Sequence, residues 1–470
     1  MIYVSNEFKE QMAKGNRAFS ASCTITLKDK TVIYIDDSKL WSDGFVIDRA
    51  TSNSGSFDIG AAIIGKFTMR LNNMYDEYTE IDFSDAEVSD VKVSLALPSG
   101  KKESVQFGIY TVNDTKYDGD LIALECLDNM RKFDIAWTVS KLTYPATLQQ
   151  IVQDACNCCG VTLATDSLQF AYSDYVILQK PEDTSVTFRD VLTWVGQICG
   201  LYWKCNPKGQ LLAGWYSMSD LAAVSNIHNL QNDVITDLSV DMEDVVITGV
   251  KIIVEGDSSE NLTYQSGQEG YMLGVEENRF ITSSNGVEIA DMLGSRVVGL
   301  RFRPMTLNML QDPTIEAGDG AIVYDRKMKQ YKTFFTDVQF SLDDDLYAVN
   351  EAESAIRNSA ERFSADTRAY QRLKRQMAKR ESEVDKAFDD LKKAMDETQG
   401  LFPISVKQED GSSILYLCDK PTLGESQVVI KLNREGWGMS TDGGETWNVG
   451  ALVDGTTITK ILDAVGINAN

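Results

Sequence analysis

Residues 67–71 read Phe-Thr-Met-Arg-Leu, and this alternation of apolar and polar side chains decides the fold class of the first part of the chain. Residues 23–27, which read Cys-Thr-Ile-Thr-Leu, alternate in the same way, and residues 105–112 and 121–124 add two further runs of strand type. A period of two residues is typical of a strand that buries one face. We therefore predict an all-β domain over residues 1–140, built as a barrel or a sandwich.

The pattern changes in residues 141–217, where helix signals appear. Thr147 is placed to cap a helix that runs through Cys159 and stops at Gly160. Thr187, with Asp190 three positions later, is placed to cap a second helix that ends at Cys199. Residues 202–215 then form two short runs around an Asn-Pro-Lys-Gly turn, which indicates a hairpin. These features predict a compact α/β module.

Strand patterns return in residues 218–348. Residues 245–254, 320–324 and 331–340 each form an apolar-rich run, and residues 287–300 are the one helical interruption. We predict a second β-barrel here. The whole chain is thus expected to be a multidomain α+β protein with two β-barrels, an α/β module, a long helix over residues 349–399 and a small β-rich tail over residues 400–470.

The composition excludes several classes of partner. The 470 residues carry 45 Lys and Arg against 70 Asp and Glu, a net charge of -25. Such a surface repels DNA and anionic lipid headgroups, which argues against sequence-specific nucleic-acid binding. No apolar run approaches the roughly 20 residues needed to span a bilayer. Residues 1–14 lack the apolar stretch of a signal peptide, so we expect synthesis in a cytoplasm and no membrane anchor.

The cysteines and the sole histidine limit the chemistry. Cys156 and Cys159, with Cys199 and Cys205, could suggest a metal site, but their spacing on a predicted helix favours small buried hydrophobes. His228 is the only histidine, so a Ser-His-Asp or Cys-His site would need it. Its polar neighbours predict a surface position instead. We predict no catalytic residue, no metal and no cofactor, and hence a protein that is not an enzyme.

Residues 349–399 carry apolar side chains at every seventh position. A helix keeps such a pattern on one face only if it supercoils around a partner. Parallel self-association is our first interpretation; the uneven charge of the segment leaves open a helix that lies on an acidic surface of its own ring or of a neighbour. The predicted oligomerisation seam consists of Val349, Ile356, Phe363, Tyr370, Met377, Val384 and Leu391.

The C-terminal segment contains one Asp-box hairpin. Residues 440–447 read Ser-Thr-Asp-Gly-Gly-Glu-Thr-Trp, in which the aspartate bonds its own turn and glycine supplies positive φ. Trp437 and Trp447 are candidate glycan contacts; the alternative is that both are buried structural aromatics. Residues 453–470 resemble a segment that leads into further modules, so we expect a native product that is longer or processed.

Short motifs in a fixed order resemble the baseplate-hub or tail-tip proteins of tailed bacteriophages, including the group called tail-associated lysins. The motifs run in order through the first 350 residues. They lie at residues 59–62, 67–72, 106–112 and 124–130 in the first β region, at 144–148, 160–163, 187–192 and 206–211 in the module, and at 247–250 and 318–319 in the second β region.

This resemblance implies a homotrimeric ring at the tail tip of a virion. Such a hub closes the tail tube and connects it to distal host-recognition parts during DNA ejection. The implied partners are further copies, a distal tail protein, tail-tube proteins, a tape-measure protein and receptor-binding or fibre proteins. No lysin domain is recognisable. Two alternatives stay open, a tail-associated peptidoglycan hydrolase with an unrecognised carboxylate site and a host receptor- or carbohydrate-binding tail module.

Overall fold

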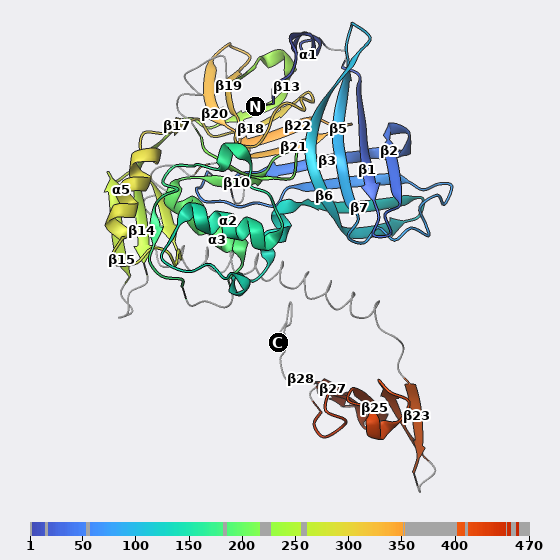
Figure 1. Cartoon of the computed structure of the whole chain (residues 1–470). Coiled ribbons are helices and arrows are strands. Elements are labelled where there is room, and N and C mark those ends of the chain that lie inside the picture. The colour runs from blue at the N-terminus through green and yellow to red at the C-terminus, as the bar shows by residue number, and fades with distance from the viewer. Residues whose placement is uncertain are drawn as a thin grey trace. The chain divides into compact units, whose positions relative to one another are not determined.

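The computed structural model describes residues 2–14, 17–52, 57–181, 186–216, 227–254, 261–350, 352, 402–408, 412–447, 449–452 and 457–459. The chain divides into two compact units, unit 1 (Met1–Ser364) and unit 2 (Ala365–Asn470), each of which is described by itself (Figure 1). The predicted boundaries of the domains stay predictions. Six seam residues lie outside the described residues, namely Ile356, Phe363, Tyr370, Met377, Val384 and Leu391.

The first β region confirms the strands predicted from alternation. In β7, every second side chain is buried, as the pattern Leu121–Asp128 predicts. A short helix, α1 (Asn6–Met12), precedes seven strands. These strands are β1 (Phe19–Thr26), β2 (Val32–Asp36), β3 (Leu40–Ala50), β4 (Lys66–Asn72), β5 (Glu87–Ala96), β6 (Lys102–Asp118) and β7 (Leu121–Asp128).

The described residues of the second β region include many short strands and the helix α5 (Gly286–Val297), close to the predicted residues 287–300. The strands are β12 (His228–Leu230), β13 (Ile235–Val240), β14 (Val245–Val254), β15 (Leu262–Gly267), β16 (Tyr271–Glu276), β17 (Arg301–Phe302), β18 (Met305–Met309), β19 (Gly320–Tyr324), β20 (Gln330–Phe334), β21 (Asp337–Ser341) and β22 (Leu346–Asn350).

The single strand predicted over residues 331–340 is wrong, because the structure has two strands there. The first, β20, pairs with β19, whereas β21 pairs with β22 and with β3 of the first region. The chain changes sheets at Phe335 and Thr336, both fully buried. Apolar content alone does not reveal such a change, since both strands need buried side chains.

The two β regions share one sheet of eleven strands. Its order is β13-β18-β22-β21-β3-β4-β7-β6-β5-β1-β2. The regions join where β21 pairs antiparallel with β3, with Phe340 opposite Ile47 and Gln339 opposite Asp48. The prediction of two closed barrels is therefore wrong. Within the described residues the sheet is open, and β2 and β13 form its two ends.

Val349 was predicted to begin the helical seam, and this prediction is wrong. Val349 lies in β22, opposite Thr306 of β18 and Asp337 of β21, and its side chain is buried. A residue held between two neighbouring strands cannot start a helix. A buried valine satisfies either period, so the sevenfold spacing extended one position too far into the strand.

The α/β module forms as predicted. Both helices, α2 (Leu148–Cys159) and α3 (Phe188–Cys199), begin with a capping box, at Thr147 and Thr187. Both end on a left-handed glycine, Gly160 and Gly200. The predicted hairpin consists of β10 (Tyr202–Cys205) and β11 (Leu211–Gly214), and a two-stranded pair, β8 (Ala146–Thr147) with β9 (Val176–Ile177), completes the module.

Two large apolar cores fill unit 1, and each contains residues from more than one of the predicted parts. One core joins Leu148 and Trp203 of the module to Trp137, which precedes the module, to Ile247 of β14 and to Leu293 of α5. The other core unites the first β region with β18, β19, β21 and β22. Figure 1 shows α5 against β14 and β15. The three predicted parts of unit 1 are thus held together by shared apolar cores.

Unit 2 contains a six-stranded antiparallel sheet in which each strand pairs with the next. Its strands are β23 (Phe402–Lys407), β24 (Ser413–Cys418), β25 (Val429–Asn433), β26 (Gly436–Ser440), β27 (Val449–Leu452) and β28 (Thr457–Thr459).

Among the described residues no helix in either unit is long and apolar enough to cross a membrane.

The capping box of α3 gives a test of local stability. Thr187 Oγ1 accepts a hydrogen bond from the N–H of Asp190, and Asp190 Oδ2 accepts one from the N–H of Thr187. Thr187→Ala should lower the free energy of unfolding of unit 1 by about 1 kcal/mol, as measured by urea unfolding. Thr187→Ser keeps the hydroxyl and should stay close to wild type. Equal losses in both variants would contradict this role of the hydroxyl.

Candidate functional site

A cluster of buried charges lies where the two β regions and the module meet. We call Arg49, Lys204, His228, Glu316 and Asp319 the junction cluster. Arg49 Nη1 lies 2.6 Å from Glu316 Oε1, and Lys204 Nζ lies 3.7 Å from Glu316 Oε2. Lys204 also donates to the carbonyl of Ala317 at 3.0 Å. Side chains from β3 and β10 thus converge on one carboxylate in the loop before β19.

His228 belongs to this cluster, so its predicted surface position is wrong. Its side chain is only 10% exposed, and its Nε2 lies 2.9 Å from Asp319 Oδ2. His228 starts β12, which pairs in parallel with β19, opposite Ala321. The polar neighbours of His228 in the sequence concealed this burial, because its partner is 91 residues further along the chain.

The turn that carries Asp319 depends on a glycine. Gly318 has φ +96, and a Cβ there would meet the Tyr202 hydroxyl at 2.1 Å. The N–H of Glu316 donates to Asp319 Oδ2 at 3.1 Å, so the two acidic residues are held in one tight loop. Gly318 therefore permits both the positive φ and the close approach of the module to this loop.

Glu316, Asp319 and Arg49 of the cluster favour their charged forms in spite of their burial. Burial opposes ionisation of Glu316, but Lys204 and Arg49 hold its pKa below the ordinary value. Burial likewise opposes ionisation of Asp319, yet the hydrogen bond and charge of His228 hold its pKa well below the usual range. Arg49 has a raised pKa, because Tyr110 and Glu316 outweigh the effect of burial. Each charge is thus stabilised by an opposite one.

Asp128, at the end of β7, behaves in the opposite way. Burial raises its pKa to about 7, although the N–H of Met130 donates to Oδ1 at 2.9 Å and Arg49 contributes a favourable charge. Gly65 lies so close that a Cβ there would meet Asp128 Oδ2 at 2.7 Å. Asp337 of β21 also has a raised pKa, of about 6, from burial and from the neighbouring Asp48. The Asp128 and Asp337 carboxyl groups therefore stay protonated to a higher pH than an ordinary aspartate.

The charge pairs of the junction cluster favour one relative orientation of the parts of unit 1. A buried ion pair adds little net stability over an apolar pair, but the loss of one partner leaves an uncompensated charge and is strongly destabilising. Such a network therefore penalises every arrangement in which the β regions separate. The cluster acts as a lock between the parts of unit 1.

The predicted burial of the clustered cysteines is confirmed. Cys156, Cys159, Cys199 and Cys205 all belong to the core shared by the module and α5, whereas Cys158 is exposed. Burial raises the pKa of the Cys156 and Cys159 thiols to about 12, which keeps both thiols protonated. In the part of the chain that the structure describes, no group of three or more His, Cys, Asp or Glu side chains is arranged to hold a metal ion.

The candidate glycan contacts lie on opposite faces of the unit 2 sheet. Trp437 is 43% exposed and stands opposite Leu432 and Ala451. Trp447 is 39% exposed and lies over Gly438, where a Cβ would meet its ring at 3.0 Å. Since neighbouring residues of a strand point to opposite faces, the two indoles do not form one platform. Glycan contact by either tryptophan stays a prediction.

Some solved structures of tail proteins are similar to part of this chain. No protein-family model and no curated protein matches the chain. Three similar solved structures cover 70–73% of this chain.

The first is the 43 kDa tail protein of prophage MuSo2 from Shewanella oneidensis, at 12% identity, 96% coverage of that chain and a TM-score of 0.41. The second is a tail protein from Neisseria meningitidis, at 11% identity, 99% coverage of that chain and a TM-score of 0.42. The third is prophage tail protein gp18 from Listeria monocytogenes, at 11% identity, 97% coverage of that chain and a TM-score of 0.41.

This chain resembles phage tail proteins. The ordered sequence motifs indicate the same class of protein. The tail-associated lysins, which the sequence resemblance included, are not among the three solved structures. The neighbours do not test the seam or the candidate glycan residues.

The lock can be tested by removal of its central charge. Glu316→Gln leaves Arg49 and Lys204 without their carboxylate, and should lower the free energy of unfolding by about 3 kcal/mol. Asp85→Asn is the matched control, since Asp85 pairs with Lys28 at 3.3 Å on the exposed surface and should cost less than about 1 kcal/mol. Similar losses in the two variants, measured by urea unfolding, would refute the lock.

The raised pKa of Asp128 predicts a pH dependence of stability. Its pKa of about 7 in the folded state exceeds the ordinary value of 3.8, so the folded state binds the proton more tightly. Stability should therefore fall between about pH 4 and pH 7, by up to about 1.4 kcal/mol per pH unit, and level off above. Urea unfolding of Asp128→Asn should show only the smaller total loss due to Asp337, which ends near pH 6. An unchanged slope would contradict this assignment.

Proposed function

We propose that this chain is a structural subunit of a phage tail tip, where it forms a homotrimeric ring as the baseplate hub. The ring would close the tail tube and connect it to distal host-recognition parts during DNA ejection. The observation that supports this proposal most directly is the open eleven-stranded sheet of unit 1. Its two ends, β2 and β13, belong to different β regions and can meet in neighbouring copies.

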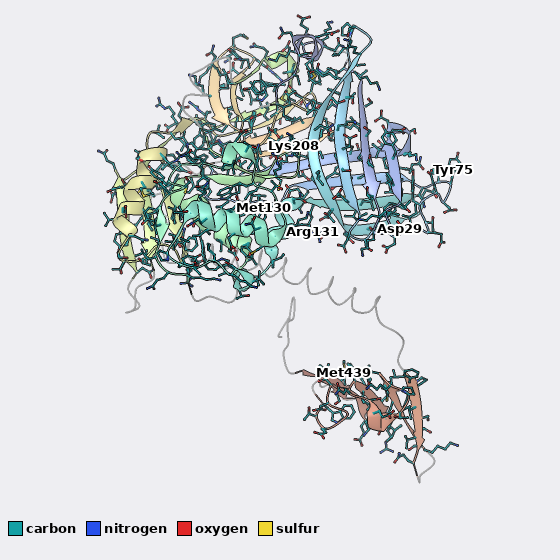
Figure 2. The ribbon with its side chains drawn as sticks, in the orientation of Figure 1. Asp29, Tyr75, Met130, Arg131, Lys208 and Met439 are labelled. Carbon is teal, nitrogen blue, oxygen red and sulfur yellow. The ribbon has the colours of Figure 1, made fainter. Side chains whose placement is uncertain are left out.

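The N–H groups of alternate residues in β2 point away from the sheet. Leu27 donates its N–H to the carbonyl of Thr31 at 2.9 Å in the β1–β2 turn, where Figure 2 labels Asp29. Bonding alternates along an antiparallel pair, so Ile33 and Ile35 face β1. The N–H groups of Val32 and Tyr34 therefore point away from β1. Their side chains are 63% and 53% exposed, an unusual position for apolar and aromatic residues on an edge.

A contact between two different edges produces a closed ring when its rotation closes. Such a ring needs subunits that do not bend at each junction. The lock of Arg49, Lys204 and Glu316 provides that rigidity, because it ties the region that carries β2 to the region that carries β13. A rigid subunit with complementary ends suits a collar around a tube, as in the proposed hub.

The proposed partners follow from this position. Copies of the chain form the ring, tail-tube and distal tail proteins contact it, and a tape-measure protein ends at it. Receptor-binding or fibre proteins would attach beyond it. The chain would act in the virion, at the tail tip, without catalysis of its own.

Assembly can be tested on the full chain by light scattering and electron microscopy. The purified protein, alone or with its tail partners, should give trimeric rings. Tyr34→Pro removes the outward N–H of β2 without loss of a bond to β1, and should reduce ring formation. Tyr34→Thr keeps the N–H and serves as control. Monomers under all conditions would contradict the ring, and rings unaffected by Tyr34→Pro would exclude the β2 edge.

A further inference from the structure

One face of the unit 2 sheet carries eight apolar side chains on strands β24 to β27. The one charged residue that the described strands place on this face, Lys407, lies at the end of β23. Strand register places these residues side by side, since opposite residues share a face. Leu415 pairs with Leu432, Leu432 with Trp437, and Trp437 with Ala451. We call this set the apolar face; it comprises Leu415, Leu417, Ile430, Leu432, Trp437, Met439, Val449 and Ala451. Figure 2 labels Met439 on this sheet.

The part of the opposite face around Val429 and Ser440 is covered by the chain itself. Cys418, Val429 and Ser440 are buried on that face. The Asp-box turn closes over it, with Asp442 accepting from the N–H of Thr446 at 2.9 Å. Trp447 follows this turn and lies over Gly438. On this face of the sheet, the Asp-box turn and the Trp447 indole ring thus cover part of the strands.

The apolar face has no such cover among the described residues. None of its eight members is buried, and Leu432 and Trp437 are 37% and 43% exposed. Within the described part of unit 2, Cys418 and Val429 are the only buried apolar residues. A single sheet layer needs a second layer over its apolar face to be stable, and two buried side chains are too few for a core.

We infer that the apolar face packs against the same face of other copies of this chain. This inference rests on the homotrimer proposed above and adds a contact between the C-terminal sheets. The apolar face, as defined by its eight residues, contains no charged side chain. It therefore matches another apolar surface and not a surface of opposite charge. A second copy supplies such a surface by symmetry.

The segment before the sheet supports the same occupant. The sevenfold seam predicted from Ile356 to Leu391 would join copies in parallel, shortly before β23 begins at Phe402. Parallel association brings the C-terminal sheets of the copies close together and raises their effective concentration. Weak apolar contacts then suffice to hold the faces together. Trp437 thereby becomes an interface residue, distinct from Trp447 on the outer face.

Hydroxyl-radical footprinting of the full chain tests this contact with an internal control. Trp437 and Trp447 have similar exposure in the single chain but lie on opposite faces. In the oligomer Trp437 and Met439 should be protected from oxidation, while Trp447 stays reactive. On dilution to monomers, Trp437 should become as reactive as Trp447.

Two matched substitutions locate the contact. Leu432→Glu places a carboxylate on the apolar face, and should expose Trp437 and weaken self-association by about tenfold or more. Val406→Glu changes a residue of nearly equal exposure, 38% against 37%, on the opposite face, and should leave both readouts at the wild-type level.

The outcomes separate this inference from the proposed function. A trimer in which Trp437 reacts like Trp447 overturns the inference and leaves the ring intact. If Trp437 stays protected in monomers, other segments of the same chain cover the apolar face, and the inference is also overturned. A chain that never self-associates overturns both the inference and the homotrimer. Protection that depends on association and is lost only in Leu432→Glu supports it.

Discussion

Arg49 and Glu316 form an ion pair across 267 residues of sequence, and the arrangement of unit 1 depends on this contact. Arg49 lies on β3, the strand through which the first β region joins β21 of the second. Glu316 also meets Lys204 of the module. Because a buried charge without its partner is costly, these three parts of the chain have one favourable arrangement. Apolar contacts alone would leave more freedom to slide.

This ion pair explains why the strands β2 and β13, which are far apart in the sequence, are the two edges of one rigid sheet. The sheet between them passes through β3 and β21, next to the locked charges. A carboxylate with a pKa of about 7, Asp128, lies near the same arginine and makes the lock sensitive to pH near neutrality.

The two units solve the burial problem differently. Unit 1 satisfies its sheets internally, with two cores that cross the predicted domain boundaries. Unit 2 leaves one sheet face without a second layer among the described residues. A surface of this kind gains free energy mainly by association, since each buried apolar side chain contributes about 1.5–3 kcal/mol. Unit 1 is therefore suited to be the rigid part and unit 2 to complete itself on assembly.

The sequence by itself determined the local elements: the capping boxes at Thr147 and Thr187, the glycine stops at Gly160 and Gly200, strand β14 and the burial of the clustered cysteines. These features depend on neighbours within a few residues, which periodicity and capping rules describe. Only the tertiary structure decided the shared sheet, the division of residues 331–340, the strand position of Val349 and the burial of His228. Each of these depends on a partner about forty to three hundred residues away, and no local pattern records which distant strand or charge will be that partner.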